Sequence, residues 1–200
     1  ICLFLQYFGS KQSSGSNQSK IDSLENVLKK ASEEKSIPIL GELTYAYFPI
    51  DLKKSLNLAG KSLEISEKIN DDELIAISNV YIADVYFEMS RFKPAIEFYE
   101  KALDYFYEQK DIKQKIYIYN KLGHTEKMLG NYNNALFYYQ KPLNLYLTED
   151  DHKISEAYNH IGIIYKLQGS YTEALNYHQK ALNAANISLD QKEIANTLNY

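Results

Sequence analysis

Histidine and cysteine are the residue types most often used in metal binding and nucleophilic catalysis, and this sequence contains few of them. Its 200 residues include one cysteine and four histidines: Cys2, His124, His152, His160 and His178. A single cysteine excludes an intrachain disulfide and a cysteine-based metal cluster. We interpret the histidines as polar residues with satisfied hydrogen bonds, and we expect no metal site.

Adjacent carboxylates are the other candidates for acid–base chemistry. Each of three pairs falls at an expected helix start or inter-helix turn: Glu33-Glu34, Asp71-Asp72 and Asp150-Asp151. Because the helix dipole favours negative charge at an N-terminus, we assign these pairs a structural role. The sequence also lacks GxGxxG, phosphate-loop, GxSxG and CxxC motifs. We therefore expect no enzyme activity and no cofactor in this chain.

The composition argues against nucleic-acid binding and in favour of helices. The formal net charge is −4, and the 22 basic residues include a single arginine, Arg91, whereas phosphate-binding surfaces favour guanidinium groups. Only eight glycines and four prolines are available for turns, while 45% of the residues are hydrophobic. Long helices with short connections are the expected result.

The elements that position the polar residues arise from an internal repeat. Three segments align with one another: residues 79–103, 119–143 and 158–182. Their corresponding alanines, Ala95, Ala135 and Ala174, are separated by 40 and 39 residues. In each unit, apolar residues recur at helical spacing on both sides of a break, which predicts a helix, a tight turn and a second helix.

These units resemble the tetratricopeptide repeat, whose pattern combines aromatic residues, Leu-Gly, a turn glycine and small residues in the second helix. The last unit matches at most positions: Tyr158, Ile161, Gly162, Tyr165, Gly169, Tyr171, Ala174, Ala181 and Leu182, with His178 in place of an aromatic. The middle unit departs from the pattern at Glu126 and Pro142, and the first has Ser90 at the turn glycine. The resemblance implies an all-α fold, a right-handed superhelical solenoid of antiparallel helix pairs.

The pattern also predicts the organisation of the chain. We expect a signal-peptide-like remnant and flexible linker over residues 1–19, a lead helix over 20–36 and the repeat array over 37–200. The expected helices of the array are 37–48, 52–69, 72–89, 92–109, 112–129, 132–147, 153–168 and 171–186. A further first helix is expected to begin near residue 194.

Pro142 lies inside one of these expected helices. It takes the place of Ala102 and Ala181 in the neighbouring units. Proline removes a backbone donor and presses on the preceding turn, so we expect a kink there. The alternative is a helix that ends at Lys141.

The resemblance implies that the first helices line a concave groove and that a protein or peptide is the partner. The groove positions form an asparagine ladder of Asn120, Asn159 and Asn199 and a lysine pair of Lys127 and Lys166, one repeat apart. His124 and Phe87 are further groove candidates, as are Val80 and Asp84. Asparagine side chains offer a donor and an acceptor to an extended peptide, and lysines meet acidic groups. The alternative is that these are ordinary solvated side chains.

Two classes of function remain open. The apolar residues 1–9, ICLFLQYFG, resemble the end of a secretory signal, with a clipped membrane anchor or a buried helix end as alternatives. Together with the repeats, this resembles the extracytoplasmic, periplasmic part of a sensor histidine kinase of a two-component system. The alternative is a free-standing adaptor, in the cytoplasm, with no linked enzyme. We expect membrane contact only through segments outside this chain, and the oligomeric state stays open.

Overall fold

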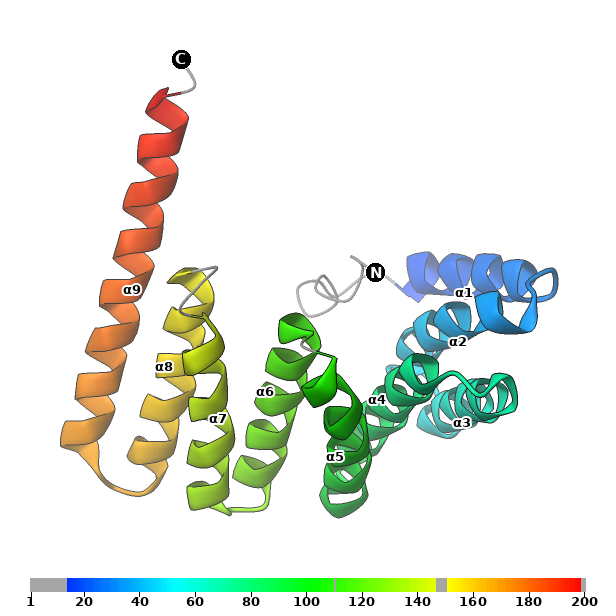
Figure 1. Ribbon diagram of the computed structural model, residues 1–200, viewed down its shortest axis with the longest axis horizontal. Helices are drawn as coiled ribbons and strands as arrows, with labels where there is room; N and C mark the ends of the chain where they lie inside the picture. The colour runs from blue at the N-terminus through cyan, green and yellow to red at the C-terminus, as the bar shows by residue number, and fades with distance from the viewer. Residues whose placement is uncertain (1–13, 110, 147–150, 199–200) are drawn as a thin grey trace. The chain divides into compact units, whose positions relative to one another are not determined.

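All regular structure in the described part of the chain is α-helical, with no β-strand (Figure 1). A computed structural model describes residues 14–109, 111–146 and 151–198. The helices are α1 Ser14–Leu28, α2 Glu33–Tyr47, α3 Leu52–Ile69, α4 Asp72–Glu88, α5 Phe92–Glu108, α6 Ile112–Met128, α7 Tyr132–Tyr146, α8 Asp151–Leu167 and α9 Tyr171–Leu198. Within these residues, no helix is long and apolar enough to span a membrane.

The chain divides into two compact units, residues 1–90 and residues 91–200. The first unit contains α1 to α4, and the second contains α5 to α9. Within each unit, every helix packs against the next one along the chain. Figure 1 shows this order in the second unit, where α6, α7, α8 and α9 stand side by side.

Aspartates start three of the helices. Asp51, Asp71 and Asp111 precede α3, α4 and α6, and each has extended backbone dihedral angles. The Asp51 carboxylate accepts from the backbone N–H groups of Lys53 and Lys54, at 2.9 and 3.0 Å. Since the first N–H groups of a helix have no partner within it, these carboxylates determine where each helix begins.

The turns inside the repeats share one backbone conformation. Ser90, Gly130 and Gly169 follow α4, α6 and α8 and have positive φ angles of 57°, 77° and 79°. Glycine adopts this left-handed conformation without steric cost, and serine does not. The repeat period therefore appears in the backbone as well as in the sequence.

Small residues let the helices of the second unit approach closely. Ala135 and Ala174 are 0% and 5% exposed, so both are buried. Ala135 belongs to a core cluster with Tyr139, Ile161 and Ile164. The core of this unit is therefore built from the positions that repeat along the sequence.

The first unit has a more polar interior. The buried hydroxyls of Ser62 and Ser78 lie 2.7 Å apart, and Ser66 is 3.0 Å from Ser78. These bonds link α3 to α4, and Ser62 stands where later repeats carry Ala102 and Ala181. A separate apolar cluster of Ile21, Leu43, Ala46 and Tyr47 holds α1 against α2.

The start of the chain differs from the prediction. The lead helix expected over 20–36 is observed as α1, Ser14–Leu28, so the expected linker is helical from Ser14. Polar side chains of this segment form hydrogen bonds that hold it as a helix against α2. Asn17, for example, donates to the carbonyl of Ala46 at 3.0 Å. The expected signal-like residues 1–9 lie outside the described residues.

Two other helices are longer than expected. Helix α2 begins at Glu33 instead of residue 37, because Ser32 has extended angles and two glutamates occupy the first turn. Helix α9 continues to Leu198, whereas the prediction ended it at residue 186 and started another near 194. No glycine or proline occurs in residues 183–193 to stop it.

Pro142 lies inside α7, which continues to Tyr146. The alternative in which the helix ends at Lys141 is therefore wrong. The kink itself stays a prediction.

Candidate functional site

The structure places most of the predicted groove residues on two helices of the second unit. Asn120, His124 and Lys127 lie on α6, and Asn159 and Lys166 lie on α8. Phe87 is partly buried on α4 of the first unit, where it makes contacts of its own. Asn199 lies outside the described residues.

In the first unit, the side chains at the equivalent groove positions are largely buried. Val80 and Asp84 are 2% and 1% exposed, so two of the expected groove positions are buried instead. The hydroxyl of Tyr45 donates to the Asp84 carboxylate at 2.7 Å. A hydrogen-bonded aspartate in the interior stabilises the packing of α2 on α4 and does not face a ligand.

We use the name α6–α8 face for eight residues at equivalent helical positions: Asn120, His124, Lys127, Met128, Asn159, Ile163, Lys166 and Leu167. Three of its apolar side chains are exposed: Met128 by 52%, Ile163 by 37% and Leu167 by 50%. Exposed apolar side chains next to polar ones are typical of interaction surfaces.

A stack of rings connects the two halves of this face. A Cβ atom on Gly123 of α6 would lie 2.8 Å from the ring of Tyr139 on α7, so only glycine permits this approach. On α8, His160 packs on the Tyr139 ring with centroids 4.8 Å apart. The Gly123–Tyr139–His160 stack therefore positions α6 relative to α8.

Burial and positive charge lower the pKa values of the two imidazoles in this region. Burial lowers the pKa of His124 to about 4, with smaller contributions from Lys127, His160 and Lys121. Burial and the charge of Lys127 also lower the pKa of His160, although Glu156 opposes the shift. Both histidines are therefore neutral at pH 7.

Lys127 is a partly buried cation on this face. Burial lowers the pKa of its ammonium group, and no described acidic residue forms an ion pair with it. A desolvated ammonium group favours a negatively charged partner.

Two buried polar atoms beside Lys127 have no hydrogen-bond partner among the described residues. They are Oδ1 of Asn120 and Nδ1 of His160. Buried polar groups in native proteins are nearly always paired, and exceptions often mark a functional position. The expectation that the histidines are satisfied polar residues is therefore wrong for His160.

The asparagine ladder is uneven. Oδ1 of Asn159 lies 3.0 Å from Nδ1 of His178 on α9, whereas Oδ1 of Asn120 has no partner within the described part of the chain. The two asparagines occupy equivalent sequence positions but differ in their hydrogen bonding.

His160 and His178 belong to the site but were not predicted from the sequence. His160 directly follows Asn159, as Lys121 follows Asn120, and His178 replaces the aromatic residue of its repeat. Glu156 is four residues from both His152 and His160, a spacing that was not recognised in the sequence. The side chain of His152 lies outside the described residues, and the described part of the chain holds no group of three potential metal ligands.

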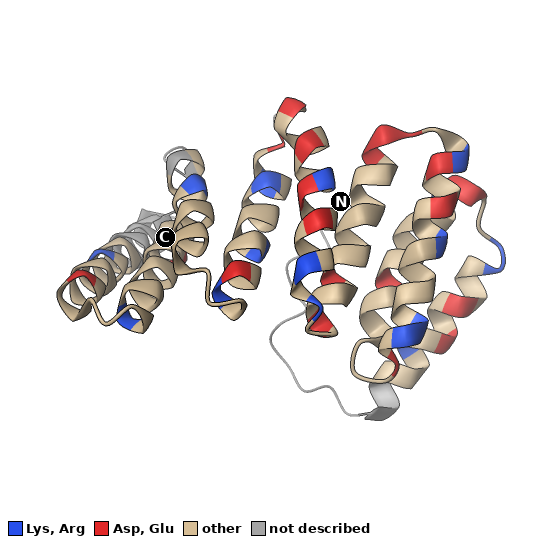
Figure 2. Ribbon diagram, turned by 90° about the horizontal axis from the view of Figure 1, so that it is seen from below, with Lys and Arg blue, Asp and Glu red and all other residues tan. Residues whose placement is uncertain are grey.

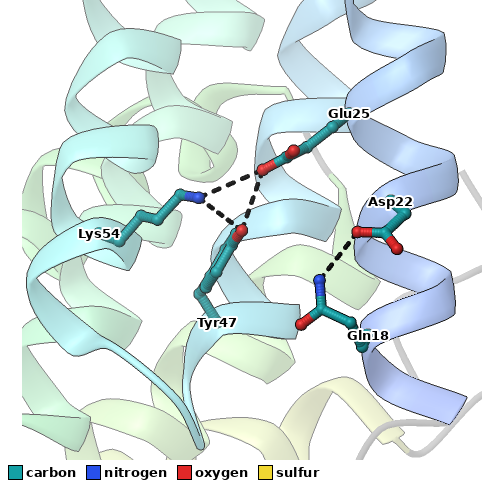
Figure 3. Close-up of polar contacts among 5 residues, drawn as sticks. All are labelled: Gln18, Asp22, Glu25, Tyr47 and Lys54. Carbon is teal, nitrogen blue, oxygen red and sulfur yellow. Dashed lines mark hydrogen bonds and ion pairs between the residues drawn. The ribbon is translucent and has the colours of Figure 1, made fainter. Parts of the chain in front are cut away.

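A second polar cluster lies in the first unit (Figure 3). The Tyr47 hydroxyl donates to Glu25 at 2.9 Å, and the Lys54 ammonium group donates to Tyr47 at 2.5 Å and to Glu25 at 3.2 Å. These bonds lower the pKa of Glu25 and raise that of Lys54. Because the three groups satisfy one another, the cluster joins α1, α2 and α3 and is not a binding site.

Charges are mixed on the surface. Figure 2 shows acidic and basic residues interspersed along the helices of each unit. Among the described residues, neither unit concentrates positive charge on one side, as nucleic-acid-binding surfaces do, and the absence of a nucleic-acid partner stays a prediction.

Comparisons with known proteins identify the repeats. Two tetratricopeptide-repeat family models match residues 78–107 and 115–187, together just over half of the chain. Response regulator aspartate phosphatase I of Bacillus subtilis (strain 168) is 31% identical over 106 residues, which are 53% of this chain and 27% of that protein. The chain thus spans about a quarter of the length of this relative.

Solved structures share the fold. BtubC (BKLC) from P. vanneervenii has a TM-score of 0.77 at 18% identity, covering 86% of this chain and 74% of that one. A Rap protein complexed with Competence and Sporulation Factor has a TM-score of 0.74 at 19% identity, covering 88% and 51%. The predicted all-α fold class is confirmed, and residues 78–107 and 115–187 consist of tetratricopeptide repeats.

Proposed function

We propose that the chain is a protein- or peptide-binding module and that its α6–α8 face binds an extended peptide segment. The observation that carries this proposal is the buried Oδ1 atom of Asn120, which has no hydrogen-bond partner among the described residues and belongs to a face with exposed apolar side chains. An extended peptide supplies main-chain N–H groups at regular spacing, and the Asn120 amide would have to turn outward to accept from one of them.

The same face suggests the chemistry of the ligand. Lys127 favours a carboxylate, while Met128, Ile163 and Leu167 favour apolar side chains. The expected ligand is a short segment that combines an acidic residue with apolar residues. Lys166 is exposed and would add a second, weaker attraction for acidic groups.

The relatives favour a signalling role. One is named as a phosphatase for a response regulator, and the Rap protein was solved with Competence and Sporulation Factor. We propose that this chain is the regulatory repeat segment of a bacterial signal-transduction protein. The sensor histidine kinase with extracytoplasmic repeats remains one form of this proposal, and the free-standing adaptor remains the alternative.

A peptide-display selection tests the binding function. We would select 12-residue peptides on the wild-type chain and measure their affinities by fluorescence anisotropy. Asn120→Ala and Lys127→Met should each weaken binding about fivefold to tenfold, since each removes one hydrogen bond or ion pair.

Matched controls lie outside the face. Asn176→Ala removes an exposed asparagine of α9, and Lys113→Met removes an exposed lysine of α6. Both should bind the selected peptides as the wild type does. Failure to select any peptide, or an unchanged affinity of Asn120→Ala, would contradict the proposed function.

Location can be tested separately. Fusion of alkaline phosphatase, which is active only after export, to the protein as expressed from its natural start codon should give enzyme activity if the repeats are extracytoplasmic. An inactive but stable fusion would support the cytoplasmic alternative.

A further inference from the structure

The two consecutive repeats of the second unit share a ring-on-glycine contact. Tyr139 on α7 and His178 on α9 are 39 residues apart at equivalent positions. Each ring lies on a glycine of the preceding helix, where an added Cβ atom would approach within 2.8 Å: Gly123 under Tyr139 and Gly162 under His178. The position therefore accepts either a phenol or an imidazole ring.

The exchange of tyrosine for histidine changes what the neighbouring asparagine can do. Nδ1 of His178 is 3.0 Å from Oδ1 of Asn159. Tyr139 has no ring nitrogen at this place, and Oδ1 of the equivalent Asn120 is buried without a partner among the described residues. Asn159 is thus held by a hydrogen bond within its own repeat, whereas Asn120 has no such bond among the described residues.

An imidazole with a proton on Nδ1 donates to the Asn159 carbonyl oxygen and thereby fixes the orientation of the amide. The two N–H donors of Nδ2 are then left for other partners. We propose that His178 is a positioning residue of the α6–α8 face: it holds Asn159 so that this residue offers N–H donors to a ligand, while Asn120 offers an acceptor.

This arrangement specifies which main-chain group of the ligand each asparagine would bind. The proposal rests on the proposed peptide-binding function and specifies its hydrogen bonds. An extended main chain alternates N–H and C=O groups, so a peptide would place an N–H group at Asn120 and a carbonyl group at Asn159. The acidic group expected at Lys127 would then belong to the α6 end, and the apolar residues to Ile163 and Leu167 at the α8 end.

The first test needs no ligand. Long-range ¹H–¹⁵N NMR spectra distinguish the two neutral tautomers of a histidine. In the wild type at neutral pH, His178 should carry its proton on Nδ1, and Asn159→Ala should abolish this preference. An unprotonated Nδ1 atom in the wild type would overturn the proposal.

The second test uses a 12-residue peptide selected by display on the wild type. His178→Phe keeps a ring over Gly162 but removes the donor, and it should weaken binding about fivefold to tenfold. Once Asn159 is replaced by alanine, His178→Phe should cause no further loss, because the histidine acts through the asparagine. Asn176→Ala, an exposed position of α9 outside the face, is the control and should leave the affinity unchanged.

The outcomes separate this proposal from the function on which it rests. If His178→Phe binds the peptide as the wild type does, or if its effect adds to that of Asn159→Ala, the role of His178 is refuted while peptide binding stands. If no peptide is selected, the proposed function fails, and the tautomer of His178 still decides whether it holds Asn159.

Discussion

At the scale of single residues, glycine determines how the aromatic rings of the repeats pack, because it has no side chain to obstruct them. Gly123 and Gly60 provide a contrast, because both are helical but only Gly123 has a ring beside it. An added Cβ atom would lie 2.8 Å from Tyr139 at Gly123 and would meet nothing within 4 Å at Gly60. The cost of the same substitution should therefore differ in sign between them.

We expect Gly123→Ala to lower the free energy of unfolding by about 1–3 kcal/mol through overpacking. Gly60→Ala should raise it by about 0.5–1 kcal/mol, since alanine favours the helix. Urea denaturation followed by circular dichroism measures both changes. Equal effects at the two positions would mean that Tyr139 does not rest on Gly123.

A second residue-scale prediction concerns pH. The pKa of His124 is about 4 in the folded chain, below its ordinary value of 6.5, because burial disfavours the charged form. As the pH falls, His124 is therefore protonated in the unfolded chain before it is protonated in the folded chain. Its contribution to stability is fully present above pH 6.5 and is lost as the pH decreases toward 4. Because this imidazole is only partly buried and solvent screens its charge, the loss is on the order of 1–2 kcal/mol by pH 4.

His124→Gln removes this titration. Its urea midpoint should depend less on pH between 6.5 and 4 than that of the wild type. Equal pH dependence of the wild type and His124→Gln would show that His124 is not desolvated.

The site residues were only partly predictable from the sequence. Asn120, His124 and Lys127 follow from the repeat register, because a helix places residues separated by four and seven positions on one face. The missing partner of Asn120 and the bond between Asn159 and His178 depend on side-chain packing across three helices, which periodicity does not contain.

At the scale of elements, the turn after α4 carries a conformational cost. Ser90 has a φ angle of 57° where the next two repeats have glycine. Ser90→Gly should raise the free energy of unfolding by about 0.5–1 kcal/mol, and Gly130→Ala and Gly169→Ala should lower it by about 1 kcal/mol. Thermal unfolding should show Ser90→Gly a few degrees above the wild type.

Such a result would confirm that the three turns are equivalent. A Ser90→Gly variant that melts below the wild type would contradict this equivalence.

Helix α7 carries the other element-scale prediction. Pro142 is buried inside a helix that continues to Tyr146, and it cannot donate to the carbonyl of Tyr138. Pro142→Ala should restore that bond, straighten the helix and raise the free energy of unfolding by about 1–2 kcal/mol. Chemical denaturation measures the change, and unchanged or lower stability would show that the proline is not a tolerated defect.

The helix boundaries show where prediction from sequence succeeds. Helices between two turn signals, such as α3 between Asp51 and Asn70, agree with the prediction because a cap and a left-handed residue specify both ends. The ends of α1 and α9 were missed, because the mostly polar residues there are compatible with both linker and helix. Tertiary contacts such as that of Asn17 with Ala46 decide such cases.

At the scale of the whole molecule, the repeat period explains why the fold could be predicted while the ligand could not. The repeats bury small and aromatic residues at corresponding positions, so the sequence pattern recurs wherever helices pack. The α6–α8 face differs between repeats, and we propose that its residues determine the binding specificity. Positions that interrupt the repeat, such as His178, are part of that proposal.

The most direct test of peptide binding is an NMR titration of the whole ¹⁵N-labelled chain with a display-selected 12-residue peptide. The account predicts that the largest chemical-shift changes occur at backbone amides of α6 and α8, around Asn120, Lys127, Asn159 and Ile163, and that Asn120→Ala reduces them. Changes centred on α5, on α7 or on the first unit, with the α6–α8 face unaffected, would contradict it.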